Sequence, residues 1–198
     1  LGSVFFVFSP DIIKILITIK DKSTQKLLMY IFMATIPASI IGFLFKNEIE
    51  ILFENINSVG FSLLFTGLVL IISSTFKNKN SKHSLLSSIA IGFAQALAII
   101  PGISRSGMTI ALSLFFGFSP KESAKFSFLL SIPVIAGAGV LGMQDIQSSE
   151  IFSTETIIAA LLSSFLIGVV ALRVLIKLLE LGKFYIFGIY CICLGFVT

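Results

Sequence analysis

Long apolar runs separated by short charged stretches make up most of the chain. The first run, residues 1–19, is interrupted by Ser9-Pro10-Asp11, and full-length or nearly full-length runs follow at 26–45, 59–76, 124–141, 157–179 and 184–197. A helix that crosses a bilayer needs about 20 apolar residues. These runs are too long for strands and lack the alternation of a membrane β-barrel. The pattern predicts an all-α, polytopic membrane protein.

Composition agrees with this reading. Of 198 residues, 56% are hydrophobic and only 12% are charged, about half the charge of an average soluble domain. A soluble enzyme, a nucleic-acid-binding protein and a secreted disulfide module are therefore excluded, and the length leaves no room for a further soluble domain. We assign the net charge of +4 to lysines on cytoplasmic loops rather than to a nucleic-acid partner. We expect one integral membrane domain over 1–198.

The charged residues between the runs predict how the chain is oriented. Basic residues gather in three places, between the first and second runs, after the third, and around the last turn: Lys14, Lys20, Lys22, Lys26, Lys77, Lys79, Lys82, Arg173, Lys177 and Lys183. The other two loops are acidic, with Glu48, Glu50, Glu54 beside Lys46, and with Asp145, Glu150, Glu155. Placing basic loops inside gives two triplets of spans with opposite directions. This predicts an inverted repeat, with 1–76 as the remainder of the first repeat and 84–198 as the second.

Residues 84–117 differ from the other runs because both flanks are basic, so the segment must enter and leave on one face. Pro101-Gly102 breaks its centre, since proline removes a helix hydrogen bond and glycine gives conformational freedom. Each half has about 16 residues, roughly 24 Å of helix, short of the roughly 30 Å apolar core. The pattern predicts a re-entrant helical hairpin.

The hairpin tip carries the candidate chemistry. Arg105 is the only charged residue in 84–117, and its planar fork suits a phosphate or a carboxylate. Ser104, Ser106 and Thr109 supply hydroxyl groups, Gly102 and Gly107 let backbone approach a ligand, and a helix starting after Ser104 would aim its N–H groups at the same point. These features favour a phosphate site only modestly. The alternative, that Arg105 pairs with a buried structural acid while the serines cap a helix, stays open.

A resemblance makes the prediction specific. The sequence IGFAQALAII at 91–100, followed by PGISRSG at 101–107, resembles the second signature of the bacterial undecaprenyl-diphosphate phosphatases, the bacitracin-resistance family. FSFLLSIP at 126–133 resembles the helix that follows it, and the similarity covers nearly the whole chain. The resemblance implies two inverted repeats, each a re-entrant hairpin followed by three spanning helices. It also implies a multi-pass protein of the bacterial plasma membrane that hydrolyses undecaprenyl diphosphate to undecaprenyl phosphate, recycles the carrier for cell-wall synthesis and gives bacitracin resistance.

The resemblance also implies roles for individual residues. Arg105 would clamp the diphosphate, with Ser104 and Ser106 beside it as the catalytic set, and with Gly102, Gly107, Thr109 and Gln95 binding substrate. For Gln95 a helix-packing role is equally open. The family's first hairpin, rich in glutamate and followed by a Ser-Gly-His stretch, has no counterpart here, and the only histidine, His83, lies on a basic loop. We therefore expect an N-terminally truncated sequence that is inactive alone. A divalent cation, Mg²⁺ or Ca²⁺, would have its ligands in that hairpin.

A transporter or flippase of a prenyl-phosphate lipid is the alternative function, because inverted repeats with broken helices are also a transporter architecture. Either function gives a prenyl diphosphate lipid and membrane lipids as partners, with no nucleic acid. Whether a homodimer forms is left open by the sequence.

Overall fold

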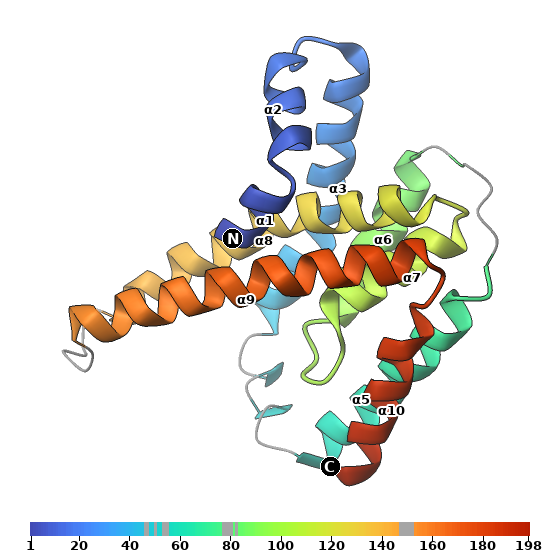
Figure 1. Ribbon diagram of the computed structural model, residues 1–198, viewed down its shortest axis with the longest axis vertical. Helices are drawn as coiled ribbons and strands as arrows, with labels where there is room; N and C mark the ends of the chain where they lie inside the picture. Colours follow the sequence, from blue (N-terminus) through green and yellow to red (C-terminus); the bar gives the residue numbers. More distant parts are fainter. Residues whose placement is uncertain (46–47, 50, 53–55, 77–80, 82, 147–152) are drawn as a thin grey trace.

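The computed structural model describes the chain except for residues 46–47, 50, 53–55, 77–80, 82 and 147–152, and the described part is helical (Figure 1). Its helices are α1 (Gly2–Val7), α2 (Ser9–Ile17), α3 (Lys22–Leu44), α5 (Ile56–Ser73), α6 (Leu85–Leu97), α7 (Arg105–Phe115), α8 (Pro120–Ile146), α9 (Thr154–Glu180) and α10 (Tyr185–Val197). Four of them, α3, α5, α8 and α9, contain stretches long and apolar enough to cross a membrane. The all-α, multi-pass prediction is confirmed.

Prolines have different effects in different apolar runs: one run divides into two helices near a proline, and two helices continue through one. The first apolar run divides into α1 and α2 around Phe8, with Pro10 in the first turn of α2, where a missing N–H costs nothing. Pro37 and Pro133 instead lie inside α3 and α8. An interior proline is tolerated in an apolar helix where neighbours compensate for the lost hydrogen bond. The interruption predicted at residues 9–11 is present, but it falls one residue earlier, at Phe8 between α1 and α2.

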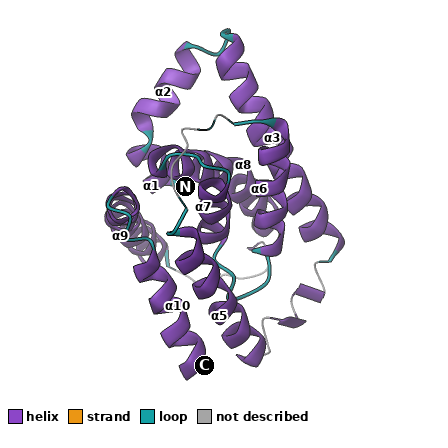
Figure 2. Ribbon diagram, turned by 90° about the vertical axis from the view of Figure 1, so that its right-hand side faces the viewer, coloured by secondary structure: helices purple, strands orange, loops and turns teal. Residues whose placement is uncertain are grey.

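Pairs of helices build the molecule. Helix α5 packs along α10, α3 along α6, and α8 beside α9 (Figures 1 and 2). The α5–α10 pair is closest at two glycines, since a Cβ atom on Gly67 would lie 2.6 Å from the carbonyl oxygen of Gly188. Small residues let helices approach this closely in a membrane protein.

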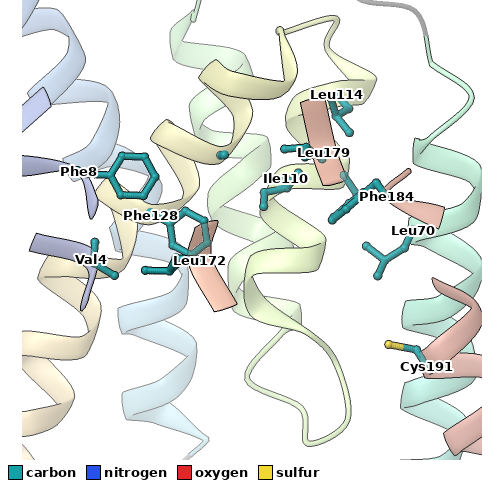
Figure 3. Packing of buried hydrophobic residues seen from close by; sticks show 12 residues of the cluster. Val4, Phe8, Leu70, Ile110, Leu114, Phe128, Leu172, Leu179, Phe184 and Cys191 are labelled. Carbon is teal, nitrogen blue, oxygen red and sulfur yellow. The ribbon is translucent and has the colours of Figure 1, made fainter. Parts of the chain in front are cut away.

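The hairpin helix α7 lies in the middle of the packed interior. Ile110 and Leu114 of α7 belong to a buried cluster that draws on five further helices, as Figure 3 shows, together with Val4, Phe8, Leu70, Phe128, Leu172, Leu179, Phe184 and Cys191. By contrast, only 6% of the most apolar stretch of α9 is buried. The apolar outer surface fits a lipid environment, whereas α7 is held by protein on several sides.

Part of the orientation prediction depends on residues outside the described ranges, namely Lys46, Glu50, Glu54, Lys77, Lys79, Lys82 and Glu150. The inverted repeat of 1–76 and 84–198 therefore stays a prediction.

Candidate phosphate-binding site at the hairpin tip

Helices α6 and α7 form the two arms of a hairpin and pack against each other. They have 13 and 11 residues, about 20 Å and 17 Å of helix, less than the roughly 30 Å apolar core of a bilayer. A capping box of Ser84 and Ser87 starts α6, and the connection turns at Gly102, whose φ is +89°. The predicted pair of short half-helices with a break at Pro101-Gly102 is present.

The N-terminus of α7 has two free N–H groups. The Ser104 side chain caps the helix by accepting a hydrogen bond from the Gly107 N–H, 3.1 Å away, and the Ser104 N–H donates to the Thr66 hydroxyl. Within the described part of the chain, the N–H groups of Arg105 and Ser106 and the Ser106 hydroxyl have no hydrogen-bond partner. A helix N-terminus with unpaired N–H groups attracts an anion.

The Arg105 side chain is paired with a neutral group. Its Nε donates to Gln95 Oε1 at 2.9 Å, and its Nη2 donates to the same oxygen. Gln95 is 1% exposed, and its Nε2 finds no partner among the described residues. The ion pair seen between described residues joins Lys125 to Asp11, at 2.7 Å, and does not include Arg105. Since an amide carries no charge, the positive charge of Arg105 is left for a ligand.

The remaining predicted residues support the tip from behind. Thr109 is fully buried, and its hydroxyl meets the Ser127 hydroxyl of α8 at 2.7 Å and the carbonyl oxygens of Arg105 and Ser106. Close packing explains why glycine occupies positions 102 and 107. A Cβ atom on Gly102 would lie 2.5 Å from a backbone oxygen of α5, and one on Gly107 would lie 2.9 Å from the Ser104 side chain.

A cavity of about 490 Å³ opens beside the tip. Ser104, Ser106 and Gly107 form its polar corner, and the rest is mostly apolar, with walls from α8, α9 and α10 that include Phe128, Leu172, Leu175, Phe184 and Phe187. A polar corner in an apolar cavity suits a ligand with an anionic head and a hydrocarbon tail.

Sequence reasoning missed Thr66, which contacts the tip from α5. In the sequence, Thr66 is only one hydroxyl residue in an apolar helix. Nothing in the pattern indicates that it contacts Gly102 and Ser104.

His83 lies at the other end of α7 from the tip, between the rings of Phe118 and Phe126, at 4.1 Å and 4.3 Å between centroids. Burial, together with the nearby positive charge of Lys125, lowers the pKa of His83 to about 4. The structure does not bring this imidazole to the residues of the tip.

The expected divalent cation finds no site among the residues that the structure describes, because no three His, Cys, Asp or Glu side chains there come close enough to hold a metal ion. The expectation places the ligands of the cation elsewhere, so the divalent cation stays a prediction.

Comparison with known proteins gives a consistent result. The family model of "Bacitracin resistance protein BacA" matches residues 1–197. An undecaprenyl-diphosphatase of Methanothermobacter thermautotrophicus is 40% identical over 171 residues, covering 83% of this chain and 94% of that protein. Undecaprenyl-diphosphatases of Halothermothrix orenii and Alkaliphilus metalliredigens are each 38% identical, covering 97% and 100% of this chain and 75% and 79% of their own lengths.

Proposed function

Because the chain belongs to the family of bacitracin resistance protein BacA, we propose that it serves the hydrolysis of undecaprenyl diphosphate to undecaprenyl phosphate and phosphate, and that its hairpin tip binds the diphosphate. The names of the three relatives support the reaction and favour it over lipid transport. The observation that carries the role of the tip is the uncompensated charge of Arg105 beside free N–H groups.

Three residues of the tip can donate hydrogen bonds to a phosphate oxygen. Arg105 contributes its guanidinium and its N–H, Ser106 its N–H and hydroxyl, and Ser104 its hydroxyl proton. Phosphoryl transfer needs little more from a protein than positioning and stabilisation of the charge on the transferring group. The prenyl tail would extend into apolar surroundings, for which the adjoining cavity is suited.

In the reaction, the oxygen of water bonds to the terminal phosphorus as the bond from that phosphorus to the bridging oxygen breaks. Undecaprenyl phosphate leaves with the bridging oxygen, and the proton of water passes to a base. No carboxylate or imidazole of the described residues is hydrogen-bonded to Ser104, Arg105 or Ser106. We therefore assign the serines as hydrogen-bond donors and leave the nucleophile unassigned. The base, and any divalent cation, would come from residues other than Ser104, Arg105 and Ser106.

The experiment measures binding of radiolabelled undecaprenyl diphosphate to the chain in detergent, beside phosphate release. We expect Arg105→Lys to weaken binding at least about tenfold, since a point charge cannot replace the bidentate fork. The matched control is Arg173→Lys, because Arg173 lies elsewhere, with its Cζ 5.9 Å from the ring of Phe6. Unchanged binding in Arg105→Lys refutes the clamp, and a wild-type chain that binds no diphosphate lipid refutes the site.

A further inference from the structure

The backbone of the hairpin tip rests directly on one face of α5. Gly102 lies so close that a Cβ atom there would be 2.5 Å from the Val59 carbonyl oxygen and 2.8 Å from the Ser62 side chain. Further along, a Cβ atom on Gly107 would be 3.1 Å from the Leu70 side chain. Val59, Ser62 and Leu70 share a face of the helix because their spacing follows the helical repeat. Helix α5 is therefore the surface on which the tip is shaped.

Thr66 lies on this same face and is fully buried. Its hydroxyl donates to the Gly102 carbonyl oxygen at 3.2 Å and accepts from the Ser104 N–H at 3.3 Å. One side chain thus holds the backbone on both sides of Ile103. It satisfies one of the N–H groups at the start of α7, and it draws the Gly102 carbonyl, whose negative end would repel an anion, toward α5.

Two other hydroxyls in the apolar helices, those of Thr35 and Ser73, form local bonds instead. Thr35 and Ser73 each donate to a carbonyl oxygen one turn earlier in their own helix, Ile31 and Leu70 respectively. This local bond is the usual outcome for a hydroxyl in a helix. The Thr66 hydroxyl instead reaches across to the loop, 36 and 38 residues away in sequence. A threonine that only filled space in an apolar helix would not need these bonds to the loop.

A second face of α5 is fixed by α10. A Cβ atom on Gly60 would lie 3.3 Å from the Gly195 carbonyl oxygen, and one on Gly67 would lie 2.6 Å from that of Gly188. With backbones this close, α5 cannot shift without disturbing α10. The bonds from Thr66 therefore tie the tip to a rigid pair of helices.

We propose that Thr66 is a positioning residue for diphosphate binding: its hydroxyl holds the loop before α7 so that the N–H groups of Arg105 and Ser106 point at one anion. The inference rests on the proposed function, because the anion is the diphosphate of the lipid. Misplacing such donors by about 1 Å can cost a factor of about a hundred in a well-oriented site.

The test compares Thr66→Val, which keeps the shape but removes the hydroxyl, with Thr66→Ser, which keeps the hydroxyl. Ser73→Ala is the matched control, since Ser73 is also buried on α5 but bonds only within its helix. The probes are undecaprenyl diphosphate and undecaprenol, the same lipid without phosphate. Hydrogen–deuterium exchange over 101–108 reports the tip backbone directly.

We expect Thr66→Val to raise the Kd for undecaprenyl diphosphate about tenfold, to leave undecaprenol binding unchanged, and to speed exchange over 101–108. Thr66→Ser should keep the Kd and the exchange rate near their wild-type values, and Ser73→Ala should change neither. If Thr66→Val does not fold, Thr66→Ala takes its place with the same expectation. Equal Kd values for wild type and Thr66→Val, or an equal loss in Ser73→Ala, overturn the positioning role while the proposed function stands. A wild-type chain that does not bind the diphosphate lipid overturns both.

Discussion

The substitution Gln95→Glu would replace the neutral partner of Arg105 with a carboxylate of almost the same shape. In the wild-type chain, Gln95 Oε1 accepts from Arg105 Nε at 2.9 Å and also from Nη2. The introduced carboxylate can keep both hydrogen bonds and the orientation of the guanidinium. What changes is the charge, because the guanidinium and the new carboxylate would together be neutral. Gln95→Glu therefore separates the geometry of the clamp from its electrostatics.

The size of the effect follows from Coulomb's law. A unit charge on Arg105 and a unit charge on a phosphate about 4 Å away attract by about 4 kcal/mol at an effective dielectric constant of about 20. The carboxylate would cancel much of this attraction, and losing half of it, about 2 kcal/mol, corresponds to roughly a thirtyfold weaker affinity. The fold should not suffer equally, because an arginine–carboxylate pair in place of an arginine–amide pair leaves no group newly unpaired.

The assay measures the Kd for undecaprenyl diphosphate and the thermal unfolding midpoint in the same detergent. We expect the Kd of Gln95→Glu to rise at least about thirtyfold with no fall in the midpoint. Gln95→Met, which removes the acceptor without adding charge, should raise the Kd less, about fivefold, through lost orientation. Wild-type affinity in Gln95→Glu would refute the idea that Arg105 needs an uncharged partner, and so would a larger loss in Gln95→Met.

Two further predictions concern stability. Gly67→Ala should lower the free energy of unfolding by about 1–3 kcal/mol, because the new methyl group would lie 2.6 Å from the Gly188 carbonyl oxygen. The control Gly137→Ala, whose methyl group meets open space, should be neutral or slightly stabilising. Equal unfolding midpoints for the two variants would contradict this prediction. Because the pKa of His83 is lowered from 6.5 to about 4 by burial and by Lys125, the unfolded chain binds a proton more readily than the folded chain; stability should therefore be lost as the pH falls from 6.5 toward 4. His83→Gln should reduce this acid sensitivity, and an unchanged pH dependence of unfolding would count against it.

Most of the fold was predictable because hydropathy reports directly on segments that must face lipid. The run at 157–179 became α9, Thr154–Glu180, and the run at 184–197 became α10, Tyr185–Val197. The boundaries were less predictable where polar residues extend a helix. Helix α8 begins at Pro120, four residues before the apolar run at 124, since proline is well accommodated in a first helical turn. Apolar content alone does not show such a start.

The residue types of the candidate site could be named from the sequence, but the directions in which their side chains point could not. Ser104 caps α7, as its place before the helix suggested. Thr109 is four residues beyond Arg105, yet its hydroxyl faces Ser127 of α8, because the packing of three helices decides which side of α7 is buried. Thr66 is far from the motif in sequence, and only the fold brings it to the tip.

If Arg105 binds the diphosphate, as proposed, its pairing with Gln95 explains how a clamp and a base can work at one site without cancelling each other. Hydrolysis needs a group that accepts a proton from water, and carboxylates and imidazoles are the usual acceptors. A carboxylate in direct contact with Arg105 would take up the charge that the diphosphate needs. The one acceptor that contacts the guanidinium side chain among the described residues is the uncharged Gln95 Oε1. Under the proposed function, Gln95 Oε1 orients the guanidinium while leaving its charge to the substrate, and the base approaches the water from elsewhere and not through Arg105.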